Sequence, residues 1–63
     1  MRLENYKICD GMLFRLPLSG KKFKIKIVPK KSRIPEKTTI IEIATGIERS
    51  YDEFKDIIVE LIK

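Results

Sequence analysis

The chain of 63 residues contains no histidine, no tryptophan and only one cysteine. Without histidine it lacks the commonest general base, the commonest metal ligand and every Ser-His or Cys-His nucleophile pair. Cys9 alone cannot form an internal disulfide or a multi-cysteine zinc site. We therefore expect no catalytic residues, no metal site and no cofactor, and we do not expect an enzyme.

Long apolar runs are also absent: none approaches the ~20 residues that would span a bilayer. The first residues, Met1 to Asn5, lack the apolar core of a signal peptide. We expect a cytoplasmic protein without a membrane partner, folded as one domain over residues 1–63. A domain this small buries only about 60% of the surface that its unfolded chain exposes. With disulfides and metals excluded, a second copy of the chain is the expected stabiliser.

Positive charge is concentrated between residues 21 and 37. Eight Lys and Arg residues stand there against one acid, Glu36, so this segment carries +7 while the whole chain carries +5. Such an uneven distribution is typical of proteins that bind a polyanion. The alternative is that the lysines only protect an exposed strand from edge-to-edge pairing. The cations predicted to contact phosphates are Arg15, Lys22, Lys24, Lys26, Lys30, Lys31, Arg33 and Lys37.

Alternation of apolar and polar residues predicts four strands. They are Asn5 to Cys9, Met12 to Leu18, Lys22 to Val28 and Thr38 to Ala44. If Cys9-Asp10-Gly11 is a three-residue hairpin loop with Gly11 in the left-handed conformation, Ile8 pairs with Met12. A two-residue Asp-Gly turn would instead pair Lys7 with Phe14, but the phase of the apolar residues favours the three-residue loop. Between the last two strands lies a basic loop, which we expect Ile34 to anchor.

Matching apolar residues between the second and third strands pairs Phe14 with Ile27, and Leu18 with Phe23. Arg15 then lies opposite Lys26, on a face that also carries the other lysines of the third strand and no obvious acid. Like charges opposite one another destabilise a sheet by a few tenths of a kcal/mol or more. This face is therefore poorly suited to stability alone, which favours a binding role.

In the fourth strand, Ile41 and Ile43 are expected to share one face, with Ile40 on the other face beside Glu42 and Ala44. Ile40 then points outward in this prediction, which indicates some cover on that side of the sheet.

The C-terminal residues predict an amphipathic helix. Ser50 is a good N-cap, and Glu53 completes a capping box. The apolar stripe that follows spans roughly 200°, more than packing on a sheet requires. We therefore expect the helix to pack on the sheet and also on a second copy of the chain. The predicted homodimer interface consists of Phe54, Ile57, Ile58, Leu61 and Ile62. The predicted fold class is α+β, a four-stranded antiparallel meander sheet followed by one C-terminal helix (ββββα).

Residues 45–61, T-G-I-E-R-S-Y-D-E-F-K-D-I-I-V-E-L, resemble the ending of the positive-cofactor-four-type transcriptional coactivators. Gly46-Ile47 stands where that family closes its last strand, Ser50 where it has a polar cap, and Asp52-Glu53-Phe54 where its helix begins. The resemblance implies a curved four-stranded sheet with one helix, dimerisation through the helix, and single-stranded DNA binding. The chain departs from the family in lacking prominent aromatic residues on the sheet and in its β-rich run Thr38 to Ala44.

Charge and resemblance together predict a small basic protein that binds nucleic acid, either non-specifically or as single-stranded DNA or RNA, with a transcription-related role. Single-strand binders also use stacking aromatic residues, but Tyr6, Phe14 and Phe23 are expected to point into the core. The alternative function is a protein interaction or regulatory module, of a phage or mobile-element type, that binds an acidic protein partner.

Overall fold

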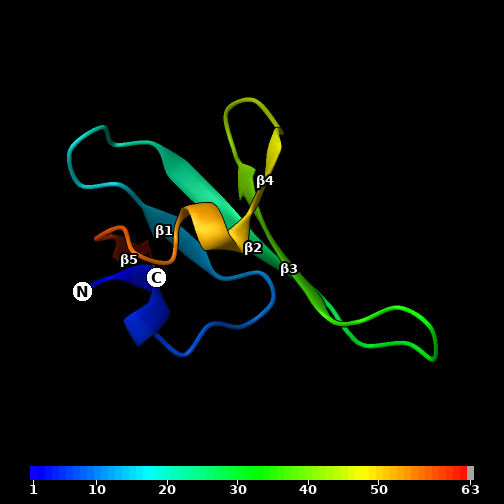
Figure 1. Cartoon of the computed structure of the whole chain (residues 1–63). Coiled ribbons are helices and arrows are strands. Elements are labelled where there is room, and N and C mark those ends of the chain that lie inside the picture. The colour runs from blue at the N-terminus through cyan, green and yellow to red at the C-terminus, as the bar shows by residue number, and fades with distance from the viewer. Residues whose placement is uncertain (63) are drawn as a thin grey trace.

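The computed structural model describes residues 1–62 and contains one five-stranded antiparallel sheet (Figure 1). The strands are β1 (Leu13–Arg15), β2 (Lys22–Val28), β3 (Lys37–Glu42), β4 (Glu48–Ser50) and β5 (Glu60–Ile62), and two short 3-10 helices are η1 (Leu3–Asn5) and η2 (Tyr51–Glu53). The spatial order is β4-β3-β2-β1-β5. The predicted ββββα fold is wrong, because the described residues contain a fifth strand and no α-helix.

The predicted C-terminal helix stops after a single turn. Its capping box is present: Ser50 Oγ accepts a hydrogen bond from the Asp52 N–H at 3.3 Å, and the Glu53 carboxylate accepts one from the Ser50 N–H at 3.1 Å. The β-branched residues Ile57, Ile58 and Val59 that follow lose side-chain freedom in a helix. The chain turns instead and forms β5, which pairs with β1.

The N-terminal segment pairs with the residues that were expected to be helical. The Leu3 N–H donates to the Ile57 carbonyl at 3.0 Å, and the Val59 N–H donates to the Met1 carbonyl at 3.1 Å. The predicted first strand, Asn5 to Cys9, is wrong, because η1 and irregular chain occupy these positions. No helix in the described part of the chain is long and apolar enough to cross a bilayer.

The core lies between one face of the sheet and a layer made by the N-terminal segment, η2 and the turn after it. Figure 1 shows η2 in front of the sheet. Phe14 and Phe23 stack with ring centroids 5.3 Å apart, and the Phe54 ring lies 6.2 Å and 5.0 Å from them. The buried core residues are Leu3, Phe14, Phe23, Ile25, Ile40, Phe54 and Val59.

Strand β2 matches its predicted bounds and alternation, with Phe23 and Ile25 buried and the lysines between them exposed. In β3 the predicted faces are reversed. Ile40 is buried opposite Ile25, whereas Ile41 pairs with Lys24 on the other face. The register places Ile40 in the core, so this residue needs no extra cover.

The predicted register between β1 and β2 is wrong by four residues, since Phe14 pairs with Phe23 and Arg15 with Lys22. An even shift leaves each side chain on its predicted face. The cause is an early turn: the Leu16 N–H donates to the Lys21 carbonyl at 2.9 Å, which closes a four-residue loop. Leu18, expected to face the core, lies in this loop and is fully exposed.

The loop between β3 and β4 repeats this construction. The Glu42 N–H donates to the Ile47 carbonyl at 3.0 Å, and the Gly46 N–H donates to the Glu42 carbonyl at 2.7 Å. Gly46 has a φ of 74°, a value that L-residues with a side chain rarely adopt. The hydroxyl before each loop glycine, Ser19 or Thr45, accepts a hydrogen bond from the N–H two residues later.

Candidate nucleic-acid interface

Four predicted cations lie on the sheet face opposite the core: Arg15, Lys22, Lys24 and Lys26. They alternate along β1 and β2 with the buried residues Phe14, Phe23 and Ile25, and all four are exposed. Successive side chains of a strand point to opposite faces. We call the surface formed by these four cations the open face.

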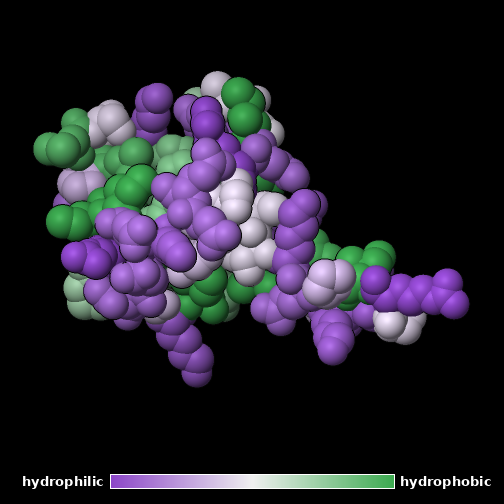
Figure 2. Space-filling view, viewed as in Figure 1, coloured by the Kyte–Doolittle hydropathy of each residue, from purple (hydrophilic) through white to green (hydrophobic). Residues whose placement is uncertain are grey.

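The other four cations lie on a hairpin that leaves the body of the protein. We call residues 29–37 the ribbon arm; every one of them is exposed. The arm projects away from the sheet (Figure 1) and is mostly hydrophilic (Figure 2), in a protein that measures 40 × 26 × 21 Å. Ile34, expected to anchor this segment, is 56% exposed and does not belong to the core. The expected loop is therefore a projecting ribbon.

The arm keeps the register of the sheet. The last pair of the β2–β3 ladder joins Val28 to Lys37, and at the tip Lys31 and Ile34 exchange two backbone hydrogen bonds of 2.9 and 3.1 Å. On each strand of the arm the two paired residues are three positions apart (28 to 31 and 34 to 37). Neither strand therefore contains an extra, bulged residue between the two pairs. The regular ladder is interrupted at the prolines of the arm, which lack an N–H.

Carboxylates from strands that were not predicted neutralise part of the open face. Arg15 Nε donates to Glu60 Oε2 at 2.8 Å, and Arg15 Nη2 lies 2.7 Å from the same oxygen. Lys26 Nζ lies 3.8 Å from Glu48 Oε1. The expectation that this face has no acidic neighbour is therefore wrong for two of its four cations. Glu60 lies in the segment that was predicted to be helical, and Glu48 lies in the unpredicted β4, so the sequence pattern did not indicate either contact.

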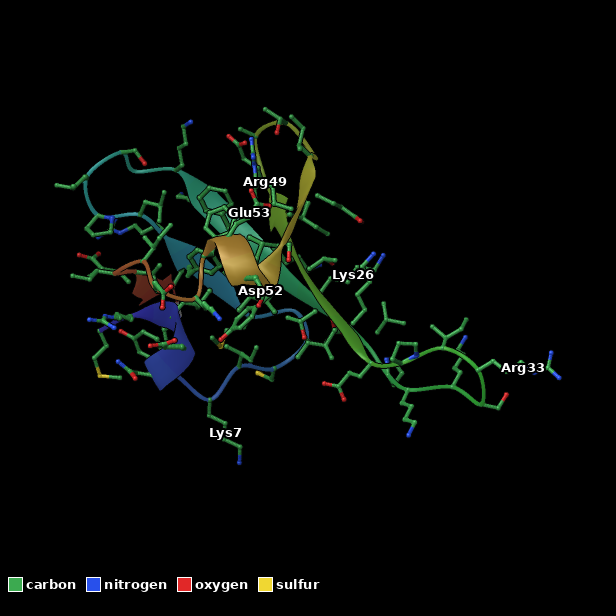
Figure 3. The ribbon with its side chains drawn as sticks, in the orientation of Figure 1. Lys7, Lys26, Arg33, Arg49, Asp52 and Glu53 are labelled. Atoms are coloured by element: carbon green, nitrogen blue, oxygen red, sulfur yellow. The ribbon has the colours of Figure 1, made fainter. Side chains whose placement is uncertain are left out.

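The arm cations form no ion pairs with other residues between 1 and 62. They are Lys30, Lys31, Arg33 and Lys37. Because Glu36 is the arm's one acid, four cations leave it a charge of +3. In Figure 3, Arg33 lies at the end of the arm farthest from the body, whereas Lys26 lies near the arm's base.

A hollow of about 450 Å³ connects the open face with the arm. Lys24, Lys26 and Lys31 contribute to its lining, and Asp10 is the acid beside them. The Asp10 carboxylate accepts a hydrogen bond from the Ile27 N–H at 2.9 Å. The whole lining consists of Asp10, Gly11, Lys24, Lys26, Ile27, Val28, Pro29, Lys31 and Ile41.

A second hollow, of about 550 Å³, lies beside β4 and is lined mainly by polar side chains. Its lining includes the carboxylates of Glu36, Glu48, Asp52 and Glu53, and Arg49 Nη1 is 3.8 Å from Glu53 Oε1 (Figure 3). These four carboxylates outnumber the two cations of the lining, Lys37 and Arg49, so the hollow is unfavourable for an anion. Residues 1–62 contain no group of three or more His, Cys, Asp or Glu side chains placed to hold a metal ion.

Aromatic side chains are missing from both the open face and the arm. The three phenylalanines are buried, and Tyr6 and Tyr51 are half-buried against the core. The Tyr6 hydroxyl donates to the Val59 carbonyl at 3.4 Å. As expected, the aromatic residues of the sheet point into the core, so the basic surface offers no stacking platform.

The residues predicted for the homodimer interface do not share a helix face. Phe54 is buried in the core of its own chain, which removes it from such an interface. Ile57 and Ile58 line an apolar groove of about 650 Å³ beside the β1–β2 loop, while Leu61 and Ile62 lie on β5. The other residues of the groove are Leu16, Pro17, Leu18, Ser19 and Asp56.

Fold and surface together define a small antiparallel β protein with a basic ribbon arm. No protein-family model, curated protein or solved structure matches the chain. The resemblance of residues 45–61 to the positive-cofactor-four-type coactivators therefore stays a prediction, and the helix that it implies for this segment is absent.

Proposed function

We propose that the protein binds nucleic acid non-specifically, through the sugar–phosphate backbone, with the open face and the ribbon arm. One observation carries the proposal: exposed cations continue from Lys22 along β2 to Arg33 at the tip of the arm. Alternate residues of a β-strand are about 6.5–7 Å apart, close to the spacing of phosphates along an extended single strand of nucleic acid. Contacts to phosphate position a protein on nucleic acid but carry no sequence information.

The cations of the proposed binding surface should not all contribute equally to binding. Arg15 and Lys26 each have a carboxylate nearby, whereas Lys22, Lys24 and the arm cations have no ion pair within the described residues. The unpaired cations can exchange their counterions for phosphates without first breaking a contact. We expect these residues to supply most of the binding free energy.

A salt titration tests the proposal. Binding of labelled DNA and RNA is measured by fluorescence anisotropy for the wild type, for a Lys22→Gln, Lys24→Gln variant, and for Lys7→Gln as a control. Lys7 is exposed and lies away from the arm (Figure 3). Each lost phosphate contact should reduce the slope of log K against log salt by about 0.9 on duplex DNA and about 0.7 on a single strand.

Two results would overturn the proposal. One is undetectable binding of every nucleic acid at low salt. The other is binding of polyglutamate as tightly as nucleic acid, because that result favours the alternative of an acidic protein partner. The Lys7→Gln control should leave the salt slope unchanged, since nothing places it on the basic surface.

We also propose that two copies associate through the apolar groove. Leu18, on the groove's rim, is 102% exposed, and Ile58 in its lining is 62% exposed. A projecting apolar side chain beside an apolar groove is self-complementary, as a two-fold symmetric contact requires. Exposed apolar patches are typical of interaction sites.

Light scattering tests this association. Leu18→Ser should convert a dimer to a monomer, whereas Ile43→Ser should not. Ile43 is 51% exposed and belongs to the similarly built β3–β4 loop, so it is a matched control. A wild type that stays monomeric at high protein concentration would refute the proposal.

A further inference from the structure

The ribbon arm adds nothing to the core, yet its two strands are paired at the base and at the tip. All nine of its residues are exposed, and the register set by β2 and β3 continues to the hydrogen-bonded pair of Lys31 and Ile34. Pro29 and Pro35 restrict the backbone on both sides of the tip. A preorganised projection without a packing role is a candidate binding element.

The dimensions of the arm match those of a DNA groove. Neighbouring strands lie about 4.8 Å apart, and four residues of strand extend about 13 Å from the Val28–Lys37 pair to the tip. The major groove of B-form DNA is about 12 Å wide and about 8.5 Å deep, and it admits a two-stranded β-ribbon. The arm is thus narrow enough to enter this groove and long enough to reach its floor.

The charges of the arm also match a groove. Because strand residues alternate, Lys30 and Lys31 lie on opposite sides of the ribbon, and Arg33 lies at the tip. Figure 3 shows nitrogen-bearing side chains on both sides of the arm. A single strand lying along the protein would contact one side only, whereas a groove presents phosphates to both.

Two other nucleic acids fit less well. Non-specific single-strand binders add stacking aromatic residues to a basic groove, and the open face and the arm carry none. Double-stranded RNA has a deep, narrow major groove that side chains cannot read. We infer that the ribbon arm enters the major groove of B-form duplex DNA. This inference rests on the proposed function and specifies duplex DNA as its ligand.

A competition experiment with two matched double variants tests the inference. Lys31→Gln with Arg33→Gln alters the arm, and Lys22→Gln with Lys24→Gln removes the same charge from the open face. All four side chains are exposed, so the fold should survive, and thermal melting checks this. The probes are duplex DNA, its single strand and the corresponding duplex RNA, all of one length.

We expect the wild type to bind duplex DNA more tightly than the other two probes. Loss of two phosphate contacts should weaken duplex DNA binding by the arm variant about 60-fold at ~0.1 M salt, and should abolish the preference over duplex RNA. The open-face variant should weaken binding to all three probes and keep the preference. Methyl green, which occupies the major groove, should displace the wild type from duplex DNA, whereas netropsin, which occupies the minor groove, should not.

The outcomes separate the inference from the proposed function. Equal or tighter binding of single-stranded DNA or duplex RNA would overturn the inference and leave nucleic-acid binding in place. The same holds if netropsin rather than methyl green displaces the protein, or if both variants lose the same affinity on every probe. Failure to bind any of the three probes would overturn the proposed function itself.

Discussion

Removing the carboxylate of Glu60 should strengthen DNA binding. Glu60 Oε2 contacts both Nε and Nη2 of Arg15 at 2.8 and 2.7 Å, and so neutralises a cation of the open face. In Glu60→Gln this guanidinium becomes available to a phosphate. One additional contact on B-form DNA changes the salt slope by about 0.9, which corresponds to at most about 15-fold higher affinity at ~50 mM salt and about 4-fold at ~200 mM.

The substitution should have little effect on folding. Both side chains are about half exposed, and exposed ion pairs contribute about 0.2–1 kcal/mol to stability. A gain in affinity, unlike a loss, cannot result from partial unfolding. Anisotropy titrations with labelled duplex DNA across a salt series measure the affinity and the slope together.

Asp56→Asn is the matched control, because it changes the net charge by the same amount. Asp56 is exposed and lines the apolar groove rather than the open face. If Glu60→Gln and Asp56→Asn steepen the salt dependence equally, affinity follows net charge, and our assignment of the open face is refuted. An unchanged slope in Glu60→Gln would show that Arg15 does not reach the DNA.

Three further predictions concern stability, measured by urea denaturation. Val59→Ala should cost about 2 kcal/mol because Val59 is fully buried. Ile58→Ala, measured at a protein concentration where the chain is monomeric, should stay within about 0.5 kcal/mol; similar losses would instead indicate the helix. Gly20→Ala and Gly46→Ala should each cost about 1 kcal/mol, because the φ of each glycine is positive. An added Cβ would meet no neighbouring atom, so the cost comes from the backbone alone. A neutral result would place these loops in another conformation. Ser50→Ala should cost about 1 kcal/mol by removing the cap, and an unaffected midpoint would mean that η2 needs no capping box.

Strand β2 could be predicted from the sequence because the pattern that defines it lies within the strand itself. Lys22 to Val28 alternate strictly, and the covered face of the sheet requires that period. The glycine of the first turn, Gly11, also has the expected left-handed conformation, with a φ of 84°. Such features depend on neighbouring residues alone.

The C-terminal segment could not be predicted this way. Phe54, Ile57, Ile58 and Leu61 fit a helical period, and the capping box before them is real. What decides the outcome is a long-range contact, because β5 completes the sheet by pairing with β1. A period counted over these eight residues cannot reveal a partner strand more than forty positions away.

The candidate site was predictable in its cations but not in its carboxylates. Charged side chains are usually exposed, and the alternation along β2 places its lysines on the face opposite the core. All eight predicted cations are exposed. Glu48 and Glu60 reach the open face only because β4 and β5 lie at the two edges of the sheet. Because these two edge strands were not predicted, the carboxylates that contact Arg15 and Lys26 were not predicted either.

The pairing of the segment around Leu3 with the segment around Ile57 affects the order in which the protein can fold. Leu3 is buried and its N–H donates to the Ile57 carbonyl, and the Tyr6 hydroxyl donates to the Val59 carbonyl 53 residues away. The hairpins from β1 to β4 need only nearby residues, so they can form early, whereas closure of the core must bring distant segments together. Such long-range closure slows folding. During synthesis, the apolar face of β1 and β2 must therefore stay uncovered until Phe54 and Val59 have been made and can pack against it.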